Sequence, residues 1–166
     1  MELKSKTNLT KLMIEFLWLF ITVIIIILTV QPVWFNFELK HFLYELVLFQ
    51  SIFITYTRYI FTLKNTFLAK AQKLKVVLLF LSLPLTFYLV QLFFNYQDFL
   101  DKQNEGMQEF AQYFVEGISN DTHFDTLQYL TKVYLFFGFS AILSVIISPF
   151  RLLISYWRVF NKTGTA

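Results

Sequence analysis

The chain has 166 residues, of which 57% are apolar and 20% aromatic, while only 15% are charged and the formal net charge is +3. Soluble domains carry about 25% charged residues, so this composition excludes a soluble globular protein. The chain has no cysteine, which excludes disulfides, thiolate nucleophiles and thiolate metal sites.

Four apolar runs approach or exceed the roughly 17 residues that cross about 30 Å of hydrocarbon. They cover residues 12–30, 43–63, 76–94 and 133–150. The first run has a basic start, but it is too long for a signal-peptide core and no small-residue cleavage site follows it, so we expect a retained helix. The sequence predicts an all-α integral membrane protein with four transmembrane helices in a single domain.

The second run contains an arginine, which is costly inside a membrane span. Ser51, Thr55, Arg58 and Thr62 follow steps of four, three and four residues, so they share one helical face that suits helix packing or a partner. Glu15 of the first run lies at nearly the same depth if the two runs are antiparallel. We therefore expect Glu15 to pair with Arg58. The alternative is that the arginine reaches lipid phosphates alone and the glutamate points to the cytoplasm.

At the start of the second run, acidic and histidine residues have the spacing found among the ligands of carboxylate-bridged metal sites. Glu38 and His41 have the Glu-x-x-His pattern, with Glu45 one turn further on. Metal-binding bundles need a second such pattern, and residues 121–125 do not supply it. We expect a solvated helix start, no metal and no cofactor. No Ser/His/Asp arrangement or glycine-rich phosphate loop is present, so we also expect no catalytic activity.

The connection 95–132 is acidic, with seven carboxylates against two lysines. Leu100, Met107 and Phe114 recur in it at helical spacing, which predicts an amphipathic helix over roughly 97–117. Its apolar face either rests on the ends of the spans or docks a partner. Thr122 and Asp125 fit a capping box that opens the fourth helix.

Small residues line one face of the fourth span, and they permit close helix approach. The row serves packing within the molecule or an interface with another subunit, and the sequence leaves both open. Its members are Gly138, Ser140, Ser144 and Ser148.

The tail after Pro149 carries Arg151 and Arg158 on one helical face. We expect an interfacial helix whose arginines contact lipid phosphates. Alternatively the tail continues the fourth span and the arginines snorkel.

The basic residues predict the orientation. Eleven of the fourteen fall before the first span, in or just after the second, or in the tail. The positive-inside rule then places both termini and residues 64–75 in the cytoplasm and 95–132 outside. Because membrane insertion alone accounts for this distribution, nucleic acid is not an expected partner. The many Phe, Ile, Lys and Asn residues suggest a bacterial source, and hence the cytoplasmic (inner) membrane.

These observations favour a non-catalytic subunit, or an assembly or stabilising factor, of a larger multi-subunit membrane complex. Its expected partners are membrane lipids and other integral membrane subunits. The alternative is a small homo-oligomeric transporter or channel for a lipid or a weak acid, because four helices of this length enclose little room and a pore would require oligomerisation.

Overall fold

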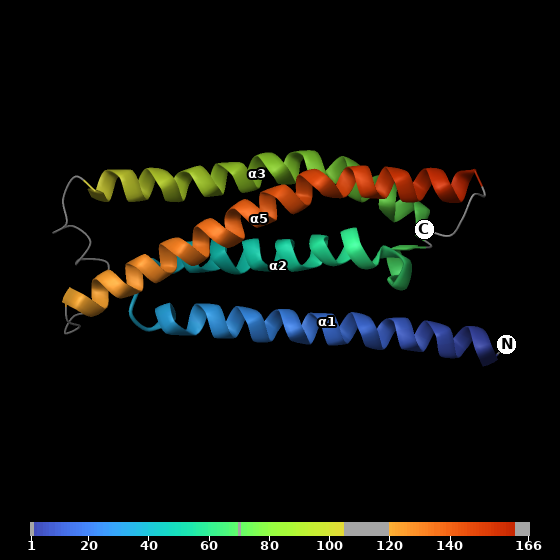
Figure 1. Ribbon diagram of the computed structural model, residues 1–166, viewed down its shortest axis with the longest axis horizontal. Helices are drawn as coiled ribbons and strands as arrows, with labels where there is room; N and C mark the ends of the chain where they lie inside the picture. The colour runs from blue at the N-terminus through green and yellow to red at the C-terminus, as the bar shows by residue number, and fades with distance from the viewer. Residues whose placement is uncertain (1, 70, 105–119, 162–166) are drawn as a thin grey trace.

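The computed structural model describes residues 2–69, 71–104 and 120–161, and these are almost entirely helical (Figure 1). They form the α-helices α1 (Glu2–Trp34), α2 (Lys40–Thr62), α3 (Gln72–Asn104) and α5 (Asn120–Phe160). Two short 3-10 turns, η1 (Leu63–Asn65) and η2 (Phe67–Ala69), connect α2 to α3.

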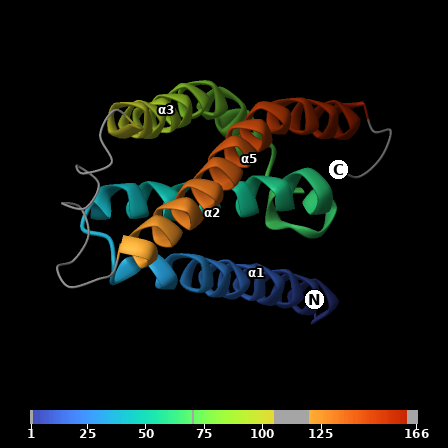
Figure 2. The ribbon, with the colours of Figure 1, turned by 60° about the vertical axis from the view of Figure 1, so that its left-hand side comes forward.

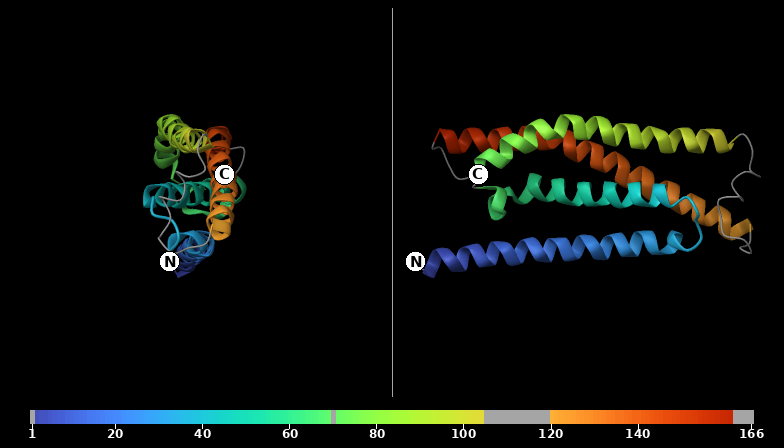
Figure 3. Two further views of the ribbon diagram at one scale, coloured as in Figure 1. Left: turned by 90° about the vertical axis from the view of Figure 1, so that its left-hand side faces the viewer. Right: turned by 180° about the vertical axis from the view of Figure 1, so that it is seen from behind.

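The helices form an elongated bundle in which successive helices run in opposite directions. The start of α1, the two 3-10 turns and the end of α5 all lie at one end of it (Figures 1 and 3). Helix α2 is central: it packs against α5 on one side and α1 on another, while α3 packs chiefly on α5. Helix α5 crosses the bundle obliquely, from the neighbourhood of α1 to the side of α3 (Figure 2). Helix α1 is therefore held mainly by α2.

The core lies between α2, α3 and α5 and is rich in aromatic rings. Tyr96 of α3 and Tyr134 of α5 are fully buried and stack with their ring centroids 3.8 Å apart. Phe49 of α2 meets the Tyr134 ring edge-on at 5.3 Å. A Cβ added to Gly138 would lie 2.7 Å from Phe93 Cδ2, so α5 approaches α3 this closely only because residue 138 has no side chain.

Three of the described helices are long and apolar enough to cross a membrane: Leu12–Trp34, Gln72–Asp101 and Asp121–Phe160. The multi-pass character predicted from composition is thus confirmed for three spans. Helix α2 falls outside this set because it carries Glu45, Gln50 and Arg58. Gln50 and Arg58 are buried, as expected for polar side chains that face neighbouring helices.

The predicted end of the third span is too early. Helix α3 continues through Asn104, so residues 97–104 are its last two turns and not the start of a separate amphipathic helix. No glycine or proline interrupts the sequence there, and nothing stops the helix. Leu100 is half-buried and packs on the core. Met107 and Phe114 lie outside the described residues, so their predicted docking role stays a prediction.

The fourth helix also differs from expectation at both ends. It starts at Asn120, before the predicted capping box, so Thr122 already lies within the helix. It runs through Pro149 to Phe160, so the tail is not a separate interfacial helix but a continuation of α5, which is the alternative that the sequence left open. Helix α5 bends along its length (Figure 2). Proline inside a helix is a usual cause of bending, and neighbouring helices make it tolerable in membranes.

Candidate functional site: the groove between α1 and α2

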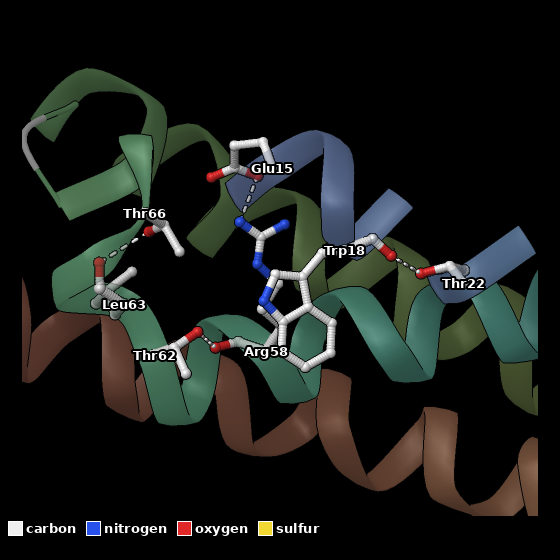
Figure 4. Close-up of polar contacts among 7 residues, drawn as sticks. All are labelled: Glu15, Trp18, Thr22, Arg58, Thr62, Leu63 and Thr66. Atoms are coloured by element: carbon white, nitrogen blue, oxygen red, sulfur yellow. Dashed lines mark hydrogen bonds and ion pairs between the residues drawn. The ribbon is translucent and has the colours of Figure 1, made fainter. Parts of the chain in front are cut away.

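The structure brings Glu15 and Arg58 together across α1 and α2. Arg58 Nη2 lies 2.5 Å from Glu15 Oε2 (Figure 4). The arginine side chain is only 7% exposed and the glutamate side chain is 26% exposed. Because the helices are antiparallel neighbours, residues near the start of α1 and near the end of α2 lie at one level, which is the relation used to predict the pair.

Arg58 is held by aromatic rings as well as by the carboxylate. Its Cζ lies 5.8 Å from the centroid of the Trp18 ring (Figure 4). It also lies 5.6 Å from the centroid of the Tyr59 ring, and both distances are within cation–π range. Its Nε is buried and makes no hydrogen bond to any described residue. A guanidinium has five N–H donors, so this cation retains capacity for a further acceptor.

The ion pair lies in a groove of about 540 Å³ between the two helices. Thr22, Ser51 and Thr55 contribute polar atoms to its lining. The remaining wall is mostly apolar, and Leu19, which is 62% exposed, shows that the groove opens to the surface. The other apolar lining residues are Leu12, Phe16, Val23, Ile26 and Ile54, with the aromatic rings of Trp18 and Tyr59 beside Arg58.

The predicted polar face of α2 is divided by the structure. Ser51 lines the groove and donates its hydroxyl to Val47 O at 2.8 Å. Thr55 lines the groove and is exposed. Thr62 does not line it and donates to Arg58 O at 2.7 Å, within its own helix. Ser51, Thr55 and Arg58 therefore share one environment, which is the side facing α1.

The small-residue row of α5 faces the bundle interior. Gly138, Ser144 and Ser148 are buried and Ser140 is half-buried. At Gly138 the neighbours are Phe93 of α3 and Phe49 of α2. Packing within the molecule thus accounts for the buried members of the row.

The two arginines of the tail occupy different environments. Arg151 is half-buried, and its Nε donates to Ile60 O in the last turn of α2 at 3.0 Å. A cation at this position satisfies a carbonyl that has no partner within its own helix and complements the helix dipole. Arg158 is exposed near the end of α5. Lipid contact stays a prediction for both residues.

Sequence reasoning missed a buried polar contact between α2 and α5. Tyr134 donates its hydroxyl to Glu45 Oε2 at 2.6 Å, and Tyr96 shares a 3.1 Å hydrogen bond with Thr131. The two residues of the Glu45 contact are 89 positions apart, so no local spacing indicates it. The only available signal was an acidic residue within a predicted span, which requires a partner.

A second polar contact that the sequence does not indicate lies at the other end of the bundle. Lys75 is 1% exposed, and its Nζ donates to Ala69 O at 2.8 Å and to Ser155 Oγ at 2.9 Å. It joins η2 and α3 to α5. In the sequence Lys75 reads only as one of several loop lysines that set the orientation.

Among the residues that the structure describes, no three His, Cys, Asp or Glu side chains gather as a metal would require. His41 is exposed at the start of α2, and the Glu45 carboxylate is engaged by Tyr134. No protein-family model matches the chain, and no curated protein or solved structure is significantly similar to it.

Proposed function

We propose that this protein is a four-span, non-catalytic subunit or assembly factor of a larger complex in a bacterial cytoplasmic membrane. Helix α2 is the fourth span. Its 23 residues extend about 34 Å at 1.5 Å per residue, enough to cross about 30 Å of hydrocarbon. Gln50 and Arg58, which lower its mean hydropathy, are buried.

The charges at the two ends of the bundle support an orientation with both termini in the cytoplasm. Lys64, Lys73 and Arg158 are exposed at the end where α1 begins. Exposed carboxylates, including Asp101 and Asp121, lie at the other end. Cytoplasmic loops are enriched in Lys and Arg, so the basic end is the cytoplasmic one.

The observation that carries the functional proposal is the filled interior. Between α2, α3 and α5 the aromatic rings of Phe49, Tyr96 and Tyr134 are fully buried, and Gly138 has no room for a Cβ. Packing of this density leaves no path for a solute between these helices. A protein with such a core acts through its surface, which favours a binding role over transport through the bundle.

Helix α1 offers the most surface for a membrane partner. Only 6% of its span is buried inside the protein, against 33% for the span of α5. Phe20 and Leu28 are among its most exposed residues and do not line the groove. We place the partner subunit on this exposed face of α1.

The proposal is tested by extracting the protein in mild detergent and identifying co-purifying chains by mass spectrometry. Stoichiometric foreign subunits are expected, and the double variant Phe20→Ala/Leu28→Ala should reduce their recovery. The matched control, Leu81→Ala/Phe87→Ala on the exposed face of α3, should not. Recovery of a homo-oligomer alone, with no other chain, would instead support the transporter alternative.

A further inference from the structure

We propose that the groove between α1 and α2 binds one membrane phospholipid. Its phosphodiester contacts Arg58, and one acyl chain lies along the apolar wall towards Ile26. This proposal needs the protein to lie in a membrane but does not depend on the partner subunit proposed above, which we place on another face of α1.

The polar end of the groove fits a phosphate. Arg58 is 8% exposed, lines the groove and has a buried Nε with no hydrogen bond to the described residues. Its contact with Glu15 uses one terminal nitrogen, Nη2. The other terminal nitrogen points away from Glu15 (Figure 4). Arginine bonds phosphate oxygens through several N–H groups at once, so a phosphodiester would use donor capacity that the protein leaves over.

The part of the groove beyond the ion pair fits one leaflet. Ile26, at its far end, comes eleven residues after Glu15 in α1, which is a rise of about 16 Å at 1.5 Å per residue. Half of a hydrocarbon core of about 30 Å is about 15 Å. The charged pair thus lies at headgroup depth when Ile26 lies near the bilayer centre, which is where an acyl chain of that leaflet ends.

The size of the groove favours an acyl chain over a protein helix. A volume of about 540 Å³ lies within the range of roughly 300–1,000 Å³ typical of small-molecule sites. A helix of about 5 Å radius fills about 120 Å³ per residue, so the groove would hold only about four or five residues of one. A flexible chain follows such a space without requiring α1 and α2 to separate.

The two charged residues make opposite predictions. Glu15 repels a phosphate and competes for the guanidinium, whereas Arg58 binds it. Glu15→Gln should therefore preserve or increase phospholipid retention, and Arg58→Gln should lower it about tenfold, the effect of losing a charged hydrogen bond. A purely structural pair would instead lose retention in both variants, and at least as much in Glu15→Gln as in Arg58→Gln, because the glutamate variant leaves the more buried charge unpaired.

The experiment uses purified protein in detergent and a phospholipid with a photoreactive group in one acyl chain. After irradiation, labelled peptides are mapped by mass spectrometry. We expect label on residues 12–26 and 51–59. Leu19→Trp fills the groove and should reduce labelling several-fold. Leu83→Trp on α3 is the control, because Leu83 is 63% exposed against 62% for Leu19 and does not line the groove.

Two further experiments test whether the phosphate and the acyl chain of the ligand both contribute to binding. A photoreactive diacylglycerol, which lacks the phosphate, should label the groove more weakly and should not respond to Arg58→Gln. Excess inorganic phosphate should not displace the phospholipid, because the acyl chain supplies much of the binding. Complete displacement would identify a phosphate site without a lipid.

Three results would overturn the proposal. One is equal labelling of the groove and of the outer face of α1 around Phe20, which would indicate bulk lipid only. A second is an equal response to Leu19→Trp and Leu83→Trp. The third is a photocrosslink from position 19 in cells to another membrane protein, which would assign the groove to a protein partner.

Discussion

Arg58 and Glu15 differ in exposure, and this difference predicts an asymmetric response to mutation. Losing one member of a buried pair costs about 3–5 kcal/mol, because the other charge is left uncompensated. Glu15→Gln removes the carboxylate partner of an arginine side chain that is only 7% exposed. Arg58→Gln instead removes the partner of a glutamate side chain that is 26% exposed and nearer water. We expect the glutamate variant to be the less stable one in delipidated detergent, with a loss near the lower end of that range.

The same two variants combine into a double-mutant cycle measured by thermal unfolding in detergent. The double variant Glu15→Gln/Arg58→Gln should be closer to wild type than the sum of the single losses, because it leaves neither charge unpaired. Strictly additive losses would mean that the 2.5 Å contact contributes no coupling energy and that Arg58 is stabilised by the rings of Trp18 and Tyr59 instead.

Gly138 shows how one missing side chain sets a helix distance. An added Cβ would lie 2.7 Å from Phe93 Cδ2 and 3.0 Å from Cε2, so the Phe93 ring must move. Gly138→Ala should destabilise the bundle by about 1–3 kcal/mol, the usual cost of overpacking. Ser140→Ala, on the same helix and half-buried, is the control and should stay within about 0.5 kcal/mol. Equal effects would show that α5 can shift freely away from α3.

Between elements, the hydroxyl of Tyr134 connects α5 to Glu45 of α2. Tyr134→Phe keeps the stacked ring but removes a 2.6 Å hydrogen bond to a carboxylate. Such bonds contribute about 1.5–3 kcal/mol, against about 0.5–1.5 for neutral ones. Tyr96→Phe, which loses a 3.1 Å bond to Thr131, is the matched control and should cost less. Equal losses of thermal stability would show that Glu45 is solvated once the hydroxyl is removed.

The elements also show where the sequence was informative. Apolar runs located the three helices that are long and apolar enough to cross a membrane, and steps of 3.6 residues placed Ser51, Thr55 and Arg58 on one face. Matching depths from opposite ends of two antiparallel helices predicted the contact with Glu15. These are local quantities, readable from one helix and its neighbour in the chain.

Other features could not be read because they depend on helices distant in sequence. The Glu45–Tyr134 and Lys75–Ser155 contacts join residues 89 and 80 positions apart. Helix ends were also misplaced. A proline favours a helix boundary at position 149, but the bundle keeps α5 intact on both sides of it.

At the scale of the whole molecule, the central position of α2 explains why a polar helix belongs in this fold. Its neighbours cover Gln50 and Arg58, and Gln50 Nε2 donates to Thr29 Oγ1 of α1 at 2.8 Å. Tyr129 of α5 donates to Thr29 O at 3.1 Å. Gln50 and Arg58 of α2 are therefore engaged by protein, whereas α1, α3 and α5 are the helices apolar enough to cross a membrane.

The antiparallel order of four helices makes a sharp prediction for membrane sidedness. The chain has no cysteine, so single cysteines can be introduced without altering the background. Lys64 follows α2 and Asn161 follows α5, both exposed at the basic end. Lys64→Cys and Asn161→Cys should react with an impermeant maleimide only after the cells are permeabilised. Asp101→Cys and Asp121→Cys, exposed at the acidic end, should react in intact cells. If α2 does not span, three crossings instead of four separate the start of α1 from the end of α5, so Ser5→Cys near the start of α1 and Asn161→Cys would differ in reactivity. Lys64 and Asn161 share a side in either case, because two helices, α3 and α5, lie between them.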